Sequence, residues 1–315
     1  MRNLARRHDL LVMLCLSGLP VVVASSTDAV CEVMVSRDVD FASRHMSCMV
    51  RLSIPRGTEG IIFTPCSDEW RQLRKICTVE LLSARRVRSI HPMREQEAGR
   101  LLHAVAASAS QRTVNLSELL SVYAADSSVR AVLRSRFKDR GVFLALLRHG
   151  TKLFVGMSLP DLYPSSCLAM LVSQTPSRIR QNRQELAAFM DAIVWEHQRN
   201  RRADDEEEDL LDVLLRIQQE GELQFPLSTD NIKSVVGDTF SGGSETAVTM
   251  LQWAMSELVK SPRAMQKAQD EVRRALAGQP TVTESSLADL NYLHLVVKEV
   301  LRLHQPSPLP LPREC

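Results

Sequence analysis

The sequence from about Asp230 to Lys260 has the pattern of one long, mostly apolar helix interrupted by two adjacent glycines. Apolar residues recur there at spacings of three and four, and Ser228 and Thr229 are residue types that cap helix N-termini. At a rise of about 1.5 Å per residue such a helix is roughly 45 Å long, which is enough to cross a sizeable domain. The chain must therefore fold around this element as a largely helical domain.

The two glycines lie in the segment Ser241-Gly242-Gly243-Ser244-Glu245-Thr246. Each glycine in a helix interior costs about 1 kcal/mol relative to alanine. The pair therefore needs a compensating reason, such as a kink or the close approach of a ligand to bare backbone. Glu245 and Thr246 follow directly and place an acid and a hydroxyl that can move protons at this gap.

Two shorter helices are predicted after the long one. Ser261-Pro262 is a capping residue followed by a proline at the first helical position. A further amphipathic helix covers about 290–304 and stops before Pro306. On it Glu299 and Arg302 share one face and can form an ion pair. Most such pairs are solvated and contribute little to stability. This E-x-x-R pair is stronger evidence for a function because it follows the glycine-interrupted helix in the sequence.

An aromatic and basic pair is predicted on a helix farther upstream. Ser67 or Asp68 can cap a helix on which Trp70 and Arg74 are four residues apart, so the indole N–H and the guanidinium project from the same side. Such a pair could bind a carboxylate or a phosphate. A half-buried tryptophan with a surface arginine stacked on it explains the spacing equally, and from these residues alone that interpretation is favoured.

These three elements, in this order, resemble the cytochrome P-450 superfamily of haem-thiolate monooxygenases, and specifically the plant A-type enzymes. The resemblance extends through further stretches of the chain, namely 20–26, 40–44, 70–77, 254–258 and 302–304. It covers essentially the whole sequence. It implies a mainly α fold with a small β region, arranged as a single, C-terminally incomplete cytochrome P-450 domain over residues 1–315.

The resemblance also implies sites for a haem cofactor. Trp70 and Arg74 match the helix pair that holds the haem propionates, and Arg313 matches a further arginine that binds a propionate. Gly242 and Gly243 match the groove in which a locally opened helix accommodates dioxygen.

Four more residues take roles from the same resemblance. Glu245 and Thr246 match the groups that relay protons for O–O cleavage, and are the expected catalytic residues. Glu299 and Arg302 match a structural ion pair that braces the core behind the haem.

A metal ligand is not expected within this sequence. In the family that the chain resembles, a cysteine thiolate ligates the iron from a loop far beyond the E-x-x-R helix, whereas Cys315 matches the strand that follows this helix. The other cysteines form no C-x-x-C pair and no spacing typical of zinc or iron–sulfur sites. Since the axial ligand tunes the reactivity of a haem, we expect this chain by itself to be inactive.

Residues 1–26 allow two interpretations. Arginines followed by an apolar run resemble a cleavable signal peptide. The alternative is a hairpin near 10–24, with Leu11–Leu16 and Pro20–Ala24 as strands. We favour the hairpin, because the apolar run has only about half the length needed to span a bilayer and is interrupted by a glycine and a proline.

The resembled family has such a hairpin after a membrane anchor that we do not find here. That family resides at the cytosolic face of the endoplasmic reticulum membrane, and for the chain without an anchor we expect a cytoplasmic location.

The composition is that of an ordinary globular protein able to bury a large core, and it does not favour nucleic-acid binding. The chain is 44% hydrophobic and 24% charged, and its net charge of +2 lacks the basic excess of nucleic-acid binders.

The resemblance implies an NADPH-cytochrome reductase as partner. Apolar residues in the corresponding regions are expected to line a pocket, and these are Ile54, Ile61, Ile62, Phe63, Val236, Phe240, Leu309 and Leu311.

The remaining sequence is helix-rich. Helices are predicted at about 29–36, 68–82, 94–108, 117–126, 131–149, 178–200 and 210–220. The acidic run 203–209 between the last two of these is interpreted as a solvated loop.

Three functional hypotheses follow. The first is hydroxylation of a hydrophobic plant metabolite by a haem iron with electrons from a reductase. The second is a truncated product that catalyses nothing. The third is a helical interaction protein without a redox role.

Overall fold

The computed structural model of the chain describes Asn3 and residues 11–108, 113–133, 139–155, 158–199, 208–278, 282–307 and 309–314. Most of the acidic run, Pro308 and Cys315 lie outside the described residues. The elements in chain order are β1 Leu11–Leu16, β2 Leu19–Ala24, α2 Thr27–Cys31, the π-helix η1 Glu32–Ser36, α3 Cys48–Ser53, α4 Gly60–Phe63, α5 Asp68–Ile76, the π-helix η2 Cys77–Leu81, α6 Ala84–Ser89, α7 His91–Ser108, α8 Leu116–Leu133, α9 Arg140–Val155, α10 Leu159–Leu162, α11 Cys167–Val172, α12 Thr175–Arg199, α13 Leu210–Glu220, α14 Thr229–Lys260, α15 Pro262–Ala275, the 3₁₀ helix η3 Glu284–Asp289 and α16 Asn291–Leu303.

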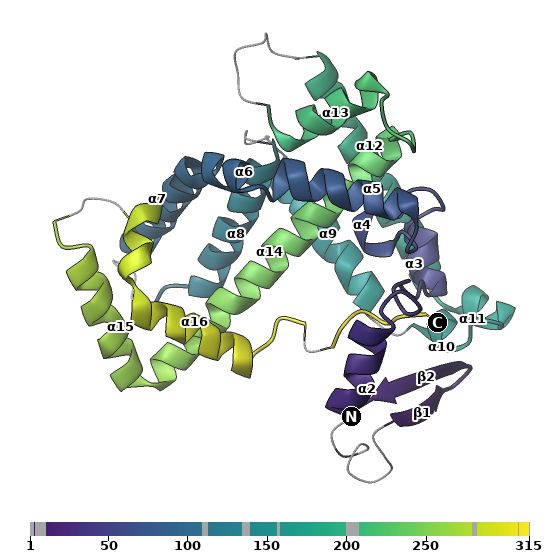
Figure 1. Ribbon diagram of the computed structural model, residues 1–315, viewed down its shortest axis with the longest axis horizontal. Coiled ribbons are helices and arrows are strands. Elements are labelled where there is room, and N and C mark those ends of the chain that lie inside the picture. Colours follow the sequence, from purple (N-terminus) through teal and green to yellow (C-terminus); the bar gives the residue numbers. More distant parts are fainter. Residues whose placement is uncertain are drawn as a thin grey trace.

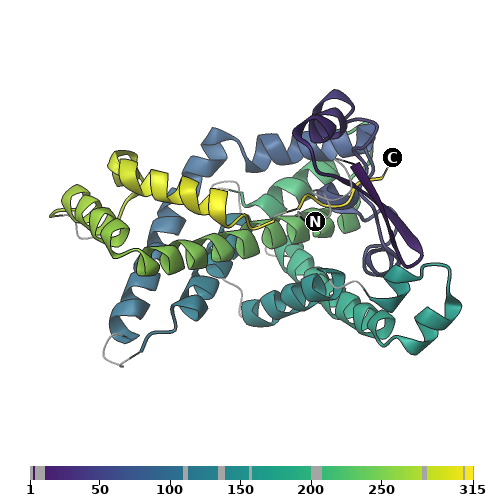
Figure 2. The ribbon, with the colours of Figure 1, turned by 90° about the horizontal axis from the view of Figure 1, so that it is seen from below.

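The long helix α14 runs through the middle of the molecule (Figures 1 and 2). It packs mainly against α8, and also contacts α4 and α13 toward one end and α15 and α16 toward the other. The predicted helix is therefore confirmed. Its start is fixed by Ser228, whose hydroxyl accepts the N–H of Asn231 while the Asn231 side chain accepts the N–H of Ser228.

The main core lies where α14 meets α5, α8, α9, α12 and α13. Three phenylalanines mark its centre: the ring of Phe143 on α9 stacks on Phe189 at 5.3 Å between centroids and meets the edge of Phe240 on α14 at 4.9 Å. Phe143 and Phe240 are completely buried. Burial of aromatic surface on this scale is a major source of stability, and here it holds α14 against two other helices.

The predicted hairpin is also confirmed. β1 and β2 pair antiparallel, with Leu11 opposite Ala24 and Leu16 opposite Leu19. Leu19 therefore belongs to the second strand, and the turn consists of Ser17 and Gly18 alone. The Gly18 N–H donates to the carbonyl of Leu162, which attaches the hairpin to α10.

The helix boundaries after residue 116 differ from the prediction. Two helices were expected at 117–126 and 131–149, but α8 continues to Leu133, and α9 begins at Arg140. The reason is packing: Val129 and Val132 are buried against the core, which extends the apolar face of α8 past the predicted end.

The last described residues form an extended segment beside the segment 41–45. The His45 N–H donates to the Pro312 carbonyl and the Glu314 N–H donates to the Ser43 carbonyl. Arg44 and Arg313 pair across this bridge. Parts of the chain about 270 positions apart in sequence thus meet, close to the hairpin (Figure 1).

Among the described helices, none combines the length and the apolar character that crossing a lipid bilayer requires.

Candidate functional site

The glycine pair does not interrupt α14. The helix is continuous from Thr229 to Lys260, so the expected local opening is absent. Two side chains hydrogen-bond within the same stretch: the Ser244 hydroxyl donates to the Phe240 carbonyl at 2.7 Å, and the Thr246 hydroxyl donates to the Gly242 carbonyl at 2.6 Å. Such bonds to the preceding turn let short hydroxyl side chains stay within a helix.

The two glycines face different surroundings. A Cβ placed on Gly242 would meet no atom within 4 Å, so its face of the helix borders open space. A Cβ on Gly243 would lie 3.4 Å from the Ser128 hydroxyl on α8, which is an ordinary contact. No side chain of the described residues therefore requires a glycine at 242.

The acid and the hydroxyl after the glycines lie at the surface of this stretch. Glu245 is about half exposed, and its carboxylate is 3.9 Å from the guanidinium of Arg148 on α9. Thr246 is exposed, with its hydroxyl on the Gly242 carbonyl. Both side chains are therefore accessible from outside the core of the molecule.

The predicted Trp70 and Arg74 pair forms, with a geometry other than the propionate-binding one that the resemblance implies. The indole N–H donates to the Ile61 carbonyl at 3.0 Å, and the Arg74 guanidinium lies 5.2 Å from the centroid of the indole ring. The stacked arrangement is the one that the sequence alone favoured. In this structure the indole donor is already used, while Arg74 is exposed and forms no ion pair within the described part of the chain.

A second basic pair contains an arginine that the sequence analysis did not select. Arg44 and Arg313 lie side by side, and burial, together with the neighbouring charge of Arg313, lowers the pKa of Arg44. Arg313 donates to the Phe41 carbonyl at 3.2 Å. One buried N–H on each guanidinium, at Arg44 Nη1 and Arg313 Nε, has no hydrogen-bond partner among the described residues.

Two adjacent guanidinium groups with unused buried donors fit an anionic group. The sequence held an indication for Arg44, because this arginine is the last residue of the stretch 40–44, which carries part of the family resemblance.

The predicted Glu299 and Arg302 ion pair is present. The guanidinium of Arg302 donates to both carboxylate oxygens of Glu299, at 2.8 and 2.6 Å. This bond lowers the pKa of Glu299. Both side chains are more than half exposed in this structure. No hydrogen bond or ion pair among the described residues links this pair to Trp70, Arg74 or the glycine stretch.

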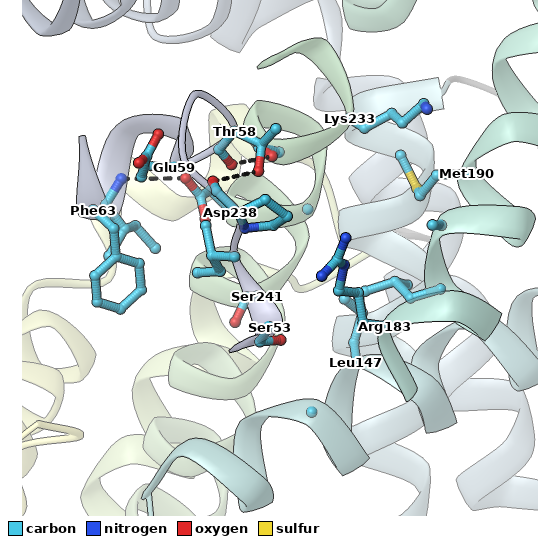
Figure 3. A pocket seen from close by; sticks show the side chains of 18 of the residues that line it. Ser53, Thr58, Glu59, Phe63, Leu147, Arg183, Met190, Lys233, Asp238 and Ser241 are labelled. Atoms are coloured by element: carbon cyan, nitrogen blue, oxygen red, sulfur yellow. Dashed lines mark hydrogen bonds between the residues drawn. The ribbon is translucent and has the colours of Figure 1, made fainter. Parts of the chain in front are cut away.

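A cavity of about 450 Å³ lies along the first half of α14 (Figure 3). It is enclosed by the loop and short helix from Ser53 to Phe63, by α9 and α12, and by Leu311. Four of the predicted apolar lining residues are found there, namely Ile54, Ile62, Phe63 and Leu311.

The other four predicted lining residues lie elsewhere. Val236 and Phe240 are completely buried in the core, Leu309 is 60% exposed, and Ile61 packs against the core. The prediction assigned the apolar face of α14 to the cavity, whereas the core takes that face. The cavity meets the more polar neighbouring face of α14, through Ser234, Asp238 and Ser241.

Asp238 is the most unusual titratable group of the cavity. Its Oδ2 accepts the backbone N–H groups of Ile61 at 2.8 Å and Ile62 at 3.2 Å. Burial nevertheless raises the pKa of Asp238 to about 7, against the lowering effect of these two bonds. The residue thus both lines the cavity and holds the wall formed by α4.

A cluster with possible metal-ligand atoms lies between α12 and α13. It consists of His197, Asp209 and Asp212. The His197 ring bonds to Asp209 at 2.9 Å, and the two aspartates cap the start of α13 reciprocally. An ion pair and a helix cap account for this geometry.

Comparison with solved structures supports the fold. A zebrafish cytochrome P450, in a structure with progesterone, matches with a TM-score of 0.79 at 21% sequence identity. The match covers 98% of this chain and 71% of that chain.

Comparison with curated proteins gives plant relatives. Desmethyl-deoxy-podophyllotoxin synthase of Sinopodophyllum hexandrum is 39% identical over 320 residues. Amorpha-4,11-diene 12-monooxygenase of Artemisia annua is 38% identical over 314 residues, and premnaspirodiene oxygenase of Hyoscyamus muticus is 36% identical over 320 residues. The alignments cover 100% of this chain but only 62% or 63% of each relative. The chain thus spans less than two thirds of the length of these relatives.

A family model described as Cytochrome P450 matches residues 1–315, which is the whole of the sequence. With the relatives at 36–39% identity, this match settles the classification that the three sequence elements suggested. The chain belongs to the cytochrome P450 family.

Proposed function

We propose that this protein serves haem-dependent monooxygenation, the hydroxylation of a lipophilic plant metabolite of terpenoid-like character. The observation that carries the proposal is the mainly apolar cavity along α14, whose wall on this helix ends at Ser241, directly before the glycine pair in the sequence. The printed names of relatives, which include a monooxygenase of amorphadiene and an oxygenase of premnaspirodiene, support the same class of reaction.

The basic groups of this chain fit a haem, whose two propionates are anionic. Arg44 and Arg313 would hold one carboxylate through their unused buried donors, and Arg74 would bind another from α5. When bound, haem supplies the activation of O₂, so that one oxygen atom enters a C–H bond and the other leaves as water, with two electrons and two protons from outside.

The residues of α14 have two tasks in this proposal, and an ion pair on α16 supports this helix. Gly242 keeps the helix surface bare, so that the cofactor and a small molecule can approach the backbone. Glu245 and Thr246 hold and pass protons at the same surface, because a carboxylate and a hydroxyl one residue apart can both exchange them. The ion pair of Glu299 with Arg302 stabilises the helix that packs on α14.

Electrons require a redox partner, for which we propose an NADPH-cytochrome reductase. The short helix α6 carries Arg85, Arg86 and Arg88, and Lys75 lies in the last turn of α5. Such a basic surface attracts an acidic face of a partner and speeds its association at low salt. The family resemblance supports work at the cytosolic face of the endoplasmic reticulum membrane.

A haem titration of the purified chain tests this proposal. Hemin is added and the affinity is measured from the absorption change of the bound cofactor, for the wild type and for a variant with Arg44→Ala and Arg313→Ala. We expect the double variant to bind haem at least tenfold more weakly, since two charge-assisted contacts are lost. Arg273→Ala, which removes an exposed arginine of α15, is the control and should leave the affinity unchanged.

Two results would contradict the assignment. One is a wild-type chain that binds no haem. The other is a double variant with the affinity of the wild type.

A further inference from the structure

One histidine joins the end of α12 to the start of α13, two helices that lie together in Figure 1. His197 belongs to the last turn of α12, and its Nε2 bonds to Oδ2 of Asp209 at 2.9 Å. Asp209 is the N-cap residue of α13. The contact therefore ties the residue on which α13 begins to the helix that precedes it in the chain.

The ring of His197 needs two protons to make both of its contacts. Its Nδ1 lies 3.0 Å from the Ile193 carbonyl, which can only accept a hydrogen bond. Its Nε2 faces the Asp209 carboxylate, which also only accepts when ionised. Because an aspartate binds a proton far more weakly than an imidazole does, the proton of this bond belongs to the ring. The charged imidazolium is thus the form that satisfies both contacts.

The other oxygens of the cluster hold Asp209 in place. Its Oδ1 accepts the Asp212 N–H at 2.9 Å, and Asp212 Oδ2 accepts the Asp209 N–H at 3.2 Å. These bonds form the helix cap and leave Asp209 Oδ2 for the ring. The side chains of His197 and Asp209 are only 17% and 7% exposed, so water can replace a lost contact only poorly.

The charges that face the ring favour its protonated form. Burial lowers the pKa of His197, but the hydrogen bond and charge of Asp209, the Ile193 carbonyl and the charge of Asp212 outweigh this effect and raise it. Burial and the charge of Asp209 also raise the pKa of Asp212. The two carboxyl groups therefore repel each other, and the imidazolium is the positive charge that compensates this repulsion.

Neighbouring charged residues take part in other contacts. Glu208, which precedes the cap, pairs with Arg216 at 3.0 Å. On α12, the guanidinium of Arg199 lies 5.1 Å from the ring centroid of Trp195.

We propose that His197 and Asp209 form a pH-sensitive clamp, in which the doubly protonated ring holds the start of α13 against α12 and the loss of one ring proton releases it. A deprotonated Nε2 would turn a lone pair toward the carboxylate, so attraction would become repulsion. The released helix is part of the main core, to which it contributes Leu210, Leu211, Leu214 and Leu215. The inference does not depend on the proposed haem function.

The direction of the pH effect follows from the ring. Since the pKa of folded His197 is raised above the value of about 6.5 for an unfolded histidine, the clamp is fully present below pH 6.5. It is lost as the pH rises through the folded value.

Amide hydrogen exchange of the purified chain tests the clamp. The reporters are the N–H groups of Asp212 and Val213, which bond to the side chain and the carbonyl of Asp209. Their exchange rates, divided by those of an unstructured peptide at the same pH, give protection factors. We expect these factors to fall at least about tenfold from pH 6 to pH 9, relative to amides of α15.

Two variants change this pH dependence in opposite ways. Asp209→Asn keeps an oxygen for the cap and turns an NH₂ donor toward Nε2, which accepts it only when the ring is neutral. Protection in this variant should therefore rise with pH. His197→Gln supplies a donor that does not titrate, so protection should stay constant. His294→Gln, which replaces an exposed histidine of α16, is the control and should behave as the wild type.

Three results would overturn the clamp. The first is wild-type protection that does not change between pH 6 and pH 9 relative to α15. The second is a variant, Asp209→Asn or His197→Gln, that keeps the pH dependence of the wild type. The third needs no variant: an NMR titration of the histidine rings in the wild type should give His197 a pKa above 6.5, and a value at or below 6.5 refutes the charged ring.

Discussion

The two halves of α14 have the same apolar period but very different surroundings. In the first half Ile232, Val235, Val236 and Phe240 are completely buried, whereas from residue 241 onward Leu258 alone is buried in this fully described helix. The first half is enclosed by several helices, and the second contacts mainly α8, α15 and α16. Periodicity thus predicts that a face is apolar, but the number of neighbours decides how much that face contributes to stability.

The largest difference between the halves is expected for core truncation. Phe240→Ala should lower the free energy of unfolding by about 3–5 kcal/mol, because it removes a fully buried ring and leaves a cavity. Val259→Ala, in the second half, removes methyl groups that are 68% exposed, and should change it by less than about 0.5 kcal/mol. Urea denaturation measures both. Similar losses in the two variants would show that the halves are equally covered in solution.

The next effect concerns the carboxyl group of the buried half. Because burial raises the pKa of Asp238 to about 7, and that of an unfolded aspartate is about 4, the folded protein loses stability as this group ionises between these pH values. Asp238→Asn removes the loss. The free energy of unfolding of the variant minus that of the wild type should therefore rise by a few kcal/mol from pH 4 to pH 7 and stay constant above.

Urea denaturation at a series of pH values measures this difference. Ser234→Ala keeps the carboxyl group and should run parallel to the wild type. A difference between Asp238→Asn and the wild type that is constant from pH 4 to pH 8 would show that Asp238 is well solvated.

A smaller effect tests the contact that covers the second half. Trp253 stacks on His304 at 3.8 Å between ring centroids, and His304 also bonds to Glu257 at 3.0 Å. Trp253→Ala should cost about 1–2 kcal/mol through lost stacking and burial. Trp195→Ala, on α12, removes a tryptophan that is 60% exposed and should cost less. Thermal denaturation compares the two, and equal losses would show that stacking on His304 contributes nothing.

The smallest effect is a gain at the junction of the halves. Gly242→Ala places a methyl group where no atom lies within 4 Å, so helix propensity should stabilise the chain by up to about 1 kcal/mol. Gly237→Ala has the same open surroundings and should gain equally. In a hemin titration, only the change at 242 should weaken cofactor binding. Unchanged haem affinity in Gly242→Ala would place the cofactor away from this glycine.

Much of the fold could be predicted because its signals are local. The caps at Ser228 and Ser67 mark the starts of the two helices that carry the glycine stretch and the Trp70 and Arg74 pair. The end of α8 could not be predicted, because it depends on burial of Val129 against distant helices.

The site was less predictable than the fold. The sequence analysis selected the residues of the glycine stretch and the ion pair as candidates, but not Arg44, which the fold places beside Arg313, 269 positions later in the chain. Asp238 was missed for a similar reason. An acid on a helix looks solvated until a loop from elsewhere in the chain donates two N–H groups to it.

The unbroken helix also sets a length scale for chemistry. Asp238 and Glu245 are seven residues apart on one rigid rod, which corresponds to two turns, one shared face and a separation of about 10 Å. A group that contacts both side chains at once must span this distance. Loop movements cannot alter this spacing, because both residues belong to the same continuous helix.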